Sequence, residues 1–252
     1  MTPDFHRPHS FQHVAVFGSS GAIGQALIKK LLQSHPDVHI HCFSRRSSQV
    51  SLMQASLSNV TCYQLAGYDE DDIAQAAKQT GDTHFDLIVI ATGMLHDEHI
   101  RPEKSLREVS ADKFHQLFTV NTIIPAMIAK HFLPRLHRKK PAVFAVLSAR
   151  VGSITDNRLG GWYAYRASKA ALNMVIKNAA IETGRTHQQA IVAGLHPGTV
   201  DSQLSKPFQD NVPPGQLFSP EQSAGHLLSV IDRLTPEDSG KCFAWDGKEI
   251  AP

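Results

Sequence analysis

The sequence predicts an α/β fold, a doubly wound parallel sheet of about seven strands in a three-layer α/β/α sandwich. Short apolar runs rich in β-branched residues alternate along the chain with longer helical patterns. A glycine-rich turn, residues 18–24, follows the first apolar run and leads into a helical pattern. The length of 252 residues suits one domain with a sizeable core and is short for two.

Buried parallel strands appear as short apolar runs, and we expect strands over residues 13–17, 38–43, 60–65, 85–91, 142–147, 190–196 and 241–245. Helical periodicity predicts helices over residues 25–32, 69–78, 112–131, 163–182 and 220–234. Pro125 interrupts the third helix and is expected to bend it. Residues 203–219 fit neither pattern and are predicted to form a mobile lid over the ligand crevice. Residues 1–10 are expected to be a flexible lead-in, and residues 11–252 a single domain.

Charge and cysteine content bound the possible functions. The 25 Lys and Arg nearly balance the 23 Asp and Glu, so neither a nucleic acid nor a membrane surface is an expected partner. No apolar run approaches the length of a membrane span, and the N-terminus lacks a signal-peptide pattern. Cys42, Cys62 and Cys242 have unrelated spacings, which indicates free thiols in a reducing compartment. A cytoplasmic location is therefore predicted.

Fifteen histidines raise the question of a metal site. The close pairs His39 with His41 and His96 with His99 are not accompanied by an HExxH motif or a Cys/His cluster. We therefore expect exposed or strand-edge histidines and no metal.

The turn over residues 18–24 reads Gly-Ser-Ser-Gly-Ala-Ile-Gly. Glycine lets the backbone approach a pyrophosphate, whose charge is stabilised by free amides and the dipole at the start of the next helix. Gly18, Ser20, Gly21, Ile23 and Gly24 are therefore predicted to bind a dinucleotide. A turn that needs glycine only for its shape is the alternative.

Two arginines, Arg45 and Arg46, follow the second predicted strand. A dinucleotide fold that selects NAD usually has a carboxylate here, whereas a guanidinium accommodates the additional phosphate of NADP. The sequence therefore favours NADP(H), with an exposed basic turn as the alternative.

Several small or polar residues follow later strands. Ala91 and Gly93 follow the fourth strand and Ser148 follows the fifth, so they are expected at the crevice where the carboxyl ends of parallel strands meet. Gly93 would let a cofactor come close to the backbone. A plain turn at Gly93 and a capping role for Ser148 are the alternatives. Asn121, ahead of Pro125, is either surface polarity or an amide that lines a groove.

Tyr165 and Lys169 lie four residues apart in the helix predicted over 163–182. On a helix both side chains face the same way, and a cation beside a phenol favours the phenolate. This arrangement predicts a tuned proton donor. An ordinary solvated helix face is the alternative.

Taken in order, these motifs resemble those of the short-chain dehydrogenase/reductase family in its single-domain branch, from about Phe11 to the end of the chain. The resemblance implies that residues 11–252 form one NADP-binding Rossmann domain. It also implies an NADP(H)-dependent oxidoreductase that transfers a hydride between nicotinamide and a small carbonyl or alcohol substrate. The long loop over residues 150–163 is similar to that of the C-factor-like, cell-signalling subgroup.

The resemblance also implies roles for individual residues. Tyr165 would give or take the proton, and Lys169 would supply charge and hold the nicotinamide ribose. Ser148 would orient the substrate oxygen, and Asn121 would hold a water that connects Lys169 to solvent. Residues after the sixth strand would complete the cofactor site near the nicotinamide, namely Pro197, Gly198, Val200 and Ser202.

The chain departs from the family pattern in three places that concern the cofactor, one of which is Ala66, where an aspartate often follows the third strand. Its glycines are spaced as Gly-x-x-Gly-x-x-Gly, whereas Gly-x-x-x-Gly-x-Gly is usual in this branch. The usual Asn-Asn-Ala-Gly after the fourth strand is Ile90-Ala91-Thr92-Gly93. A protein that binds NADP(H) as a sensor or scaffold is therefore one alternative. A nucleotide-sugar epimerase is another, although the chain lacks the C-terminal lobe of those enzymes.

The resemblance finally implies self-association. The long helices predicted over residues 112–131 and 163–182 would pair with those of a second subunit, so a homodimer or homotetramer is expected.

Overall fold

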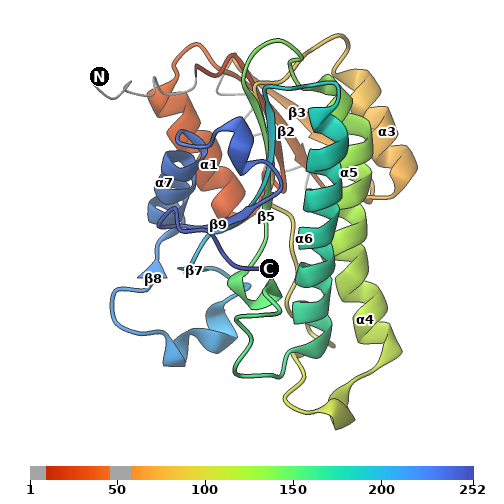
Figure 1. Ribbon diagram of the computed structural model, residues 1–252, viewed down its shortest axis with the longest axis vertical. Helices are drawn as coiled ribbons and strands as arrows, with labels where there is room; N and C mark the ends of the chain where they lie inside the picture. The colour runs from red at the N-terminus through yellow and green to blue at the C-terminus, as the bar shows by residue number, and fades with distance from the viewer. Residues whose placement is uncertain (1–9, 46–57) are drawn as a thin grey trace.

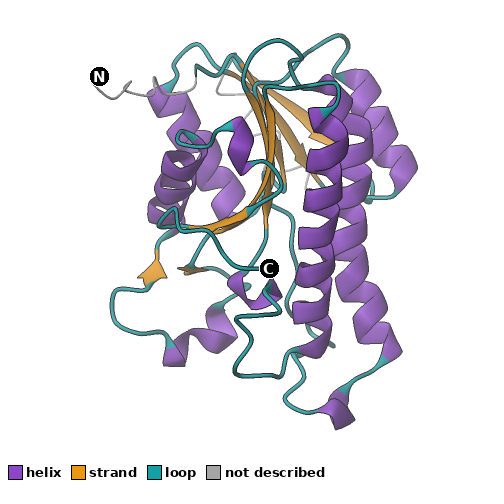
Figure 2. Ribbon diagram, in the orientation of Figure 1, coloured by secondary structure: helices purple, strands orange, loops and turns teal. Residues whose placement is uncertain are grey.

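The computed structural model describes residues 10–45 and 58–252. Within these residues, seven parallel strands form a central sheet in the order β3-β2-β1-β4-β5-β6-β9 (Figures 1 and 2). The strands are β1 (His13–Phe17), β2 (His39–Ser44), β3 (Val60–Gln64), β4 (Leu87–Ile90), β5 (Ala142–Leu147), β6 (Ala190–His196) and β9 (Cys242–Ala244). The predicted doubly wound α/β fold is confirmed. All of the predicted lead-in except Ser10 lies outside the described residues.

Helices cover both faces of the sheet (Figure 1). One layer contains α1 (Ala22–Ser34) and α7 (Pro220–Ile231), and the other contains α3 (Glu70–Gln79), α4 (Ala111–Phe118), α5 (Ile124–Phe132) and α6 (Tyr163–Gly184). Short 3-10 helices occur at η1 (Leu106–Glu108), η3 (Leu133–Arg135), η4 (Arg150–Gly152), η5 (Lys206–Asn211) and η6 (Pro236–Asp238). Because both faces are covered, the central strands are buried on both sides, which explains their nearly continuous apolar sequences.

Each helical layer has its own core. Leu27, Leu31 and Leu227 from α1 and α7 pack with Val14 and Val16 of β1. On the opposite face, residues of α3, α5 and α6 pack with Phe17, Phe43 and Phe144 from the strands. Successive strand residues project to opposite faces, so both cores are built from the same strands.

The helix predicted over residues 112–131 consists of α4 and α5 joined by a π-helical segment, η2 (Thr119–Ile123). Pro125 lies in the first turn of α5, directly after the π-helical segment, and it lacks the N–H that the continuous helix would use to bond a carbonyl of the preceding turn. The irregularity therefore comes before the proline. It contains Asn121, whose side chain is fully buried.

The sheet order defines where a ligand can enter. β1 lies between β2 and β4, so the connections diverge to opposite sides of the sheet beyond β1, and ligands bind at the carboxyl ends of such strands. A short parallel pair, β7 (Thr199–Val200) and β8 (Leu217–Phe218), lies at this end of the molecule (Figure 1). The predicted lid, residues 203–219, follows β7 and contains both η5 and β8, so it has regular structure and is hydrogen-bonded back to β7 near its end.

No helix among the described residues combines the length and apolar character needed to cross a bilayer. The same residues include no group of three or more His, Cys, Asp or Glu side chains placed to hold a metal ion.

A cluster of histidines lies on β1 and β2. The rings of His13, His39 and His41 stand 4.8–5.9 Å apart, and His41 Nδ1 lies 3.1 Å from the Tyr63 hydroxyl. His41 Nε2 is buried and has no hydrogen-bond partner in the described parts of the chain. Burial, with a smaller contribution from the charges of His39 and His13, lowers the pKa of His41 to about 3. The folded protein therefore holds this ring neutral.

This cluster predicts sensitivity to acid. Because the folded pKa of His41 lies below the unfolded value, stability is lost as the pH falls from about 6.5 toward 3, by roughly 2 kcal/mol at pH 5. His41→Phe should remove this loss. We expect the midpoint of thermal unfolding to fall by roughly 5 °C more between pH 7.5 and pH 5 in the wild type than in His41→Phe. The exposed His99→Phe is the control, and equal losses in all three proteins would contradict the assignment.

Candidate functional site

The predicted phosphate turn connects β1 to α1. Gly18 has a φ of +76°, and a Cβ there would lie 2.9 Å from the backbone carbon of Ala91. A Cβ on Gly24 would overlap the carbonyl oxygen of Gly18. These two glycines therefore give the turn its shape and bring the ends of β1 and β4 together. The expected start of the helix at residue 25 was three residues late, because α1 begins at Ala22 within the turn itself.

The start of α1 is open to an anion. Gly21 is the N-cap residue, no side chain caps the helix, and its first turn holds no acidic residue. The first amides of the helix are thus without intrahelical acceptors and can bind a phosphate. Ser20 and Ile23 flank this position, and the Ser20 carbonyl accepts a hydrogen bond from Gln25 Nε2 at 2.9 Å. The turn fits the pyrophosphate of a dinucleotide.

The carbonyl oxygen of Phe43, near the end of β2, holds the turn from outside. It accepts hydrogen bonds from the backbone N–H of Gly18 at 3.0 Å and of Ser19 at 3.3 Å. The Ser19 hydroxyl donates to the same oxygen at 3.2 Å. The position of β2 therefore sets the position of the phosphate turn.

Arg45 follows β2 directly and is exposed, with its guanidinium carbon 5.8 Å from the centre of the Tyr68 ring. The Tyr68 hydroxyl donates a long hydrogen bond to the Phe43 carbonyl at 3.5 Å. A cation over the face of an aromatic ring is attracted to it, so Tyr68 favours this placement of Arg45 beside the turn. Arg46 lies outside the described residues.

Gly93, after β4, is exposed and lies beside two predicted site residues. A Cβ at Gly93 would be 3.7 Å from Asn121 Oδ1 and 3.9 Å from Lys169 Nζ. Ala91, two residues earlier, donates its N–H to the Phe17 carbonyl at 2.9 Å and continues the pairing of β4 with β1. The hydroxyl of Thr92 is buried and has no hydrogen-bond partner in the part of the chain that the structure describes. This edge of the sheet therefore has both space and unused polar capacity.

Asn121 fixes the loop after β4 to α6. Its Oδ1 accepts from the Met94 N–H at 2.9 Å, and its Nδ2 donates to the Met94 carbonyl at 2.8 Å and to Ser168 Oγ at 3.1 Å. Both amide hydrogens are therefore in use within the protein. Ser168, fully buried beside Lys169, has no signal in the sequence that singles it out.

Tyr165 and Lys169 lie one turn apart on α6 and are 8% and 3% exposed. Lys169 Nζ donates to the Leu147 carbonyl at the end of β5, at 2.8 Å. Burial lowers the pKa of Lys169 to about 8 and raises the pKa of Tyr165 to about 12. The pKa of the tyrosine is therefore raised, not lowered by the lysine as expected, because desolvation dominates at both groups.

Ser148 donates its hydroxyl hydrogen to Asn173 Oδ1 at 2.6 Å and is buried. Asn173 lies one turn beyond Lys169 on α6, so this bond ties the end of β5 to the helix. The next residue, Ala149, packs against the small apolar cluster that contains Tyr165. In the protein without substrate, the hydroxyl of Ser148 is thus engaged with Asn173.

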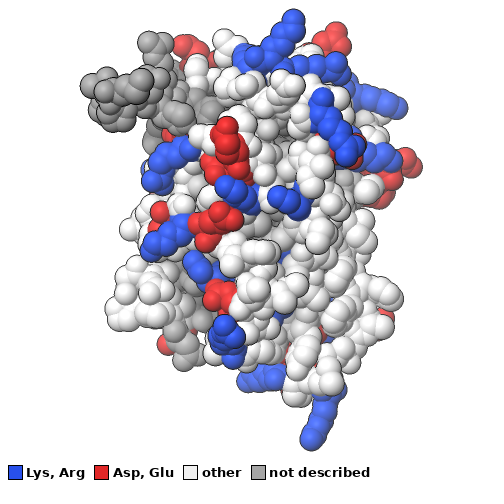
Figure 3. All heavy atoms as spheres, in the orientation of Figure 1, with Lys and Arg blue, Asp and Glu red and all other residues white. Residues whose placement is uncertain are grey.

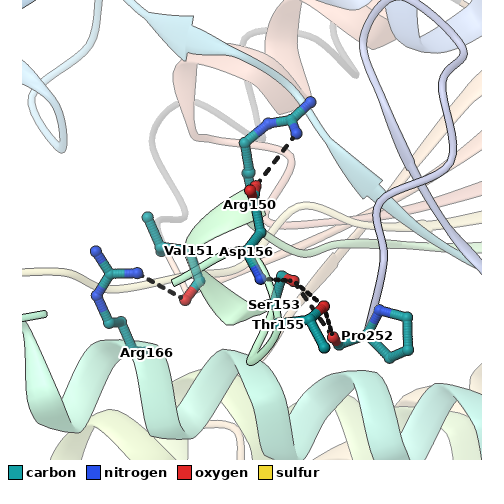
Figure 4. Close-up of polar contacts among 7 residues, drawn as sticks. All are labelled: Arg150, Val151, Ser153, Thr155, Asp156, Arg166 and Pro252. Atoms are coloured by element: carbon teal, nitrogen blue, oxygen red, sulfur yellow. Dashed lines mark hydrogen bonds and ion pairs between the residues drawn. The ribbon is translucent and has the colours of Figure 1, made fainter. Parts of the chain in front are cut away.

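The loop between β5 and α6 is held at several points (Figure 4). The Pro252 carbonyl accepts from the Thr155 N–H at 3.1 Å, from the Thr155 hydroxyl, and weakly from Ser153 Oγ at 3.4 Å. Arg166, next to Tyr165, donates to the Val151 carbonyl at 3.3 Å. These contacts fix the loop to α6 and to the last residues of the chain.

The start of α6 depends on a strained residue. Trp162, the N-cap, has a φ of +52° and is the one non-glycine residue with positive φ in the described chain. Its N–H donates to the Glu103 carbonyl at 2.6 Å, and the buried Glu103 carboxylate accepts from the Ala164 N–H at 3.3 Å. This backbone conformation is unfavourable for tryptophan, and such strain is typical of functional sites.

Aromatic side chains enclose Tyr165. The Trp162 ring lies 6.1 Å from the ring of Tyr165 and 5.1 Å from that of Phe208, which is part of η5 in the predicted lid. His96 lies 5.5 Å from Phe208, and its Nε2 is 3.1 Å from the Leu204 carbonyl. The lid segment thus packs against the start of α6.

The residues predicted to bind near the nicotinamide lie after β6, at the same end of the sheet. The Pro197 carbonyl accepts from Ser223 Oγ at 2.9 Å, and Gly198 has a φ of +77° with its α-carbon against the Phe218 ring. Val200 is buried in β7, and the Ser202 carbonyl accepts from the Lys206 N–H at 3.0 Å. These contacts form the base of the lid.

Nearly all of the predicted site residues that the structure describes thus lie at the carboxyl end of the sheet. Sequence reasoning missed Ala149, Trp162, Glu103, Asn173 and Phe208. The Gly160-Gly161 pair before Trp162 signals an unusual backbone, but the other four carry no local signal because their roles arise from contacts between distant segments.

A glycine turn at the end of β1, a doubly wound sheet and a buried Tyr-x-x-x-Lys helix define a nucleotide-binding oxidoreductase class. Residues 12–213 match the short chain dehydrogenase family, and the chain belongs to that family.

Three similar proteins illustrate the relation. The C-signal protein of Myxococcus xanthus is 34% identical over 146 residues, which cover 58% of this chain and 82% of that protein. The carbonyl reductase Sniffer of D. melanogaster superposes with a TM-score of 0.82 and 22% identity, over 97% of this chain and 100% of that one. An NADPH-bound carbonyl reductase from chicken fatty liver superposes with a TM-score of 0.84 and 22% identity, over 98% and 97%. The two structures show the fold, and the C-signal match is partial.

Proposed function

We propose that this short-chain dehydrogenase is an NADP(H)-dependent oxidoreductase that interconverts a carbonyl and an alcohol, with Tyr165 as the general acid and base. One observation carries the proposal. Tyr165 and Lys169 are buried one turn apart on α6. They lie beside Gly93, at the same carboxyl end of the sheet as the phosphate turn. When bound, NADP(H) would supply or accept the hydride.

In carbonyl reduction, Tyr165 donates its phenolic proton to the substrate oxygen. The phenol is protonated at neutral pH, the form that a proton donor needs, and burial raises its pKa further, to about 12. Lys169, with its pKa near 8, is a cation at neutral pH and stabilises the phenolate that remains. The same ammonium would hold the nicotinamide ribose, and Asn121 keeps the loop beside it in position.

The cofactor would lie across the carboxyl ends of β1 and β4. Backbone amides at the start of α1 would bind its pyrophosphate, and Arg45 with Arg46 would bind the 2′-phosphate that distinguishes NADP from NAD. The nicotinamide end would lie beside Gly93 and Ala91. Residues at the base of the lid would line its other side, namely Pro197, Gly198, Val200 and Ser202.

The substrate is proposed to carry an apolar, aromatic group. Tyr165 belongs to a cluster that includes Leu95 and Leu117, and Trp162, Phe114 and Phe208 pack against this cluster. A carbonyl compound with an aromatic ring would stack on these side chains and bury apolar area as it binds.

Self-association through α4, α5 and α6 is also proposed. The face over α6 and the adjoining part of α5 carries few charged side chains (Figure 3). Met174 and Ile181 lie seven residues apart on one face of α6 and are 61% and 52% exposed. Ile123 is 50% exposed. Covering such a face by a second copy would remove apolar surface from water.

Light scattering at micromolar concentration should give the mass of a dimer or a tetramer, and the mass of a monomer would contradict the proposal.

Tyr165→Phe tests the central assignment. The variant keeps the ring but cannot donate a proton, so NADPH oxidation over a panel of aryl ketones and aldehydes should fall by about 10²-fold or more. NADPH binding, measured by fluorescence titration, should stay within a few-fold. Tyr163→Phe, two residues earlier on the same helix, is the matched control. Unchanged turnover in Tyr165→Phe would refute the role of this phenol. Binding of NADPH by the wild type without turnover of any carbonyl would favour a sensor.

Two neighbouring variants test the proposed role of Ser148. To hold the substrate oxygen, its hydroxyl must turn from Asn173 to the substrate, and Ser148→Ala should then lower kcat/KM by about 10²-fold. Ala149→Ser supplies a hydroxyl at the position that packs against the Tyr165 cluster. Activity of Ser148→Ala near that of the wild type, with an increase in Ala149→Ser, would instead identify residue 149 as the one that faces the substrate.

Replacement of the two arginines tests the choice of cofactor. Arg45→Ala with Arg46→Ala should weaken NADPH binding by about 10-fold or more, because charge-assisted hydrogen bonds to the phosphate are lost, and should change NADH binding little. Lys248→Ala, an exposed cation near the opposite edge of the sheet, is the control. Equal losses for both nucleotides would remove the reason to assign NADP.

A further inference from the structure

Cys42 and Cys62 face each other across β2 and β3. They are direct partners in the parallel register, so their side chains project to the same face of the sheet with α-carbons about 4.8 Å apart. That spacing lies within the range of about 4.4–6.8 Å that a disulfide can bridge. Both thiols are free, and each shifts the pKa of the other.

The two thiols differ in access. Cys42 is 1% exposed within the core beneath α1 and α7, whereas Cys62 is half-buried and packs against the edge of that core. Donation from the Cys42 thiol lowers the pKa of Cys62, while the same hydrogen bond and burial raise the pKa of Cys42. Cys62 is therefore the more accessible sulfur and the one that more readily forms a thiolate.

This pair lies next to the contact that positions the phosphate turn. Cys42 directly precedes Phe43, whose carbonyl accepts from the N–H groups of Gly18 and Ser19. Arg45 follows three residues after Cys42. A displacement of β2 at Cys42 would therefore act on the turn and on the proposed 2′-phosphate site together.

We propose that Cys42 and Cys62 form a peroxide-sensitive dithiol site, and that its oxidation to a disulfide weakens NADP(H) binding. The Cys62 thiolate attacks hydrogen peroxide and becomes a sulfenic acid, and the departing hydroxide takes up a proton to form water. Attack by the Cys42 sulfur then forms the S–S bond, and the sulfenic oxygen leaves as a second water with the Cys42 proton. The two sulfurs lose two electrons and peroxide gains two. A dithiol such as dithiothreitol reverses the step.

The consequence follows from the geometry. The α-carbon spacing suits a disulfide, but the bond also requires a Cβ–S–S–Cβ torsion of about 90°, and we expect this requirement to shift Cys42 on β2, beside the Phe43 carbonyl. The hydrogen bonds to Gly18 and Ser19 then lose their alignment. This consequence rests on the proposed cofactor, whereas the disulfide itself does not.

Cys242 supplies a matched control. It lies in β9, at the opposite edge of the sheet, and its thiol donates to Asn173 Oδ1 at 3.3 Å. Burial raises the pKa of Cys242 to about 11. No other cysteine of the described chain is paired with it across the sheet.

The experiment treats the purified chain with hydrogen peroxide, alkylates the remaining thiols, and maps linked peptides by mass spectrometry. NADPH affinity is then measured by fluorescence titration before oxidation, after oxidation and after dithiothreitol. We expect a Cys42–Cys62 link and affinity lowered on the order of tenfold, about the effect of losing one ordinary hydrogen bond, with recovery after reduction. Cys62→Ser and Cys42→Ala should resist this loss, and Cys242→Ala should behave like the wild type.

Each other outcome is decisive. Oxidation of Cys62 alone to a sulfinic acid, or a link that involves Cys242, would overturn the dithiol site. A mapped Cys42–Cys62 disulfide with unchanged NADPH affinity would overturn the coupling to the turn. If the reduced chain binds no NADPH, the proposed cofactor fails, while the mass measurement still decides whether the disulfide forms.

Discussion

The buried ammonium group of Lys169 is the constraint on which the site depends. An ammonium group taken out of water is costly unless it is hydrogen-bonded, and here the Leu147 carbonyl at the end of β5 accepts from it. That bond fixes the position of α6 relative to the end of β5. Gly152, in the loop that follows β5, passes so close that a Cβ there would lie 2.9 Å from the Lys169 backbone. Lys169 therefore also sets the position of Tyr165, and at neutral pH the phenol is protonated and the ammonium group is charged.

The cofactor half of the site is organised around a different atom, the carbonyl oxygen of Phe43. By accepting from Gly18 and Ser19, it makes the phosphate turn an extension of β2 as well as of β1. A Cβ at Gly18 or at Gly24 would be too close to neighbouring backbone atoms, which explains why these two positions of the unusual spacing are glycine. Each glycine satisfies a packing requirement inside the turn, and Gly21 leaves the start of α1 open. The dithiol pair lies one residue from this oxygen, which is why a modest chemical change there can reach the cofactor.

On the substrate side, the lid and the loop before α6 form one aromatic layer over Tyr165. The left-handed conformation of Trp162 turns the chain into α6, and Glu103 supports it from another segment. Phe208, in the lid, packs against the Trp162 ring. Under the proposed function, a substrate would bind against these rings, and the shape of this layer would select among carbonyl compounds.

The elements whose signal is local could be predicted from the sequence. Apolar runs predicted β5 and β6 with their observed bounds. The order of motifs along the chain indicated the fold and the Tyr-x-x-x-Lys helix. These features could be predicted because hydrophobic periodicity and turn residues depend on neighbouring positions in the sequence. The tertiary structure alone decided what those residues touch. It engaged the Ser148 hydroxyl with Asn173, put Ala149 against the Tyr165 cluster, raised the tyrosine pKa by burial and paired Cys42 with Cys62 across two strands. Such contacts join segments far apart in the chain, and desolvation depends on the surrounding atoms, so neither can be derived from local pattern.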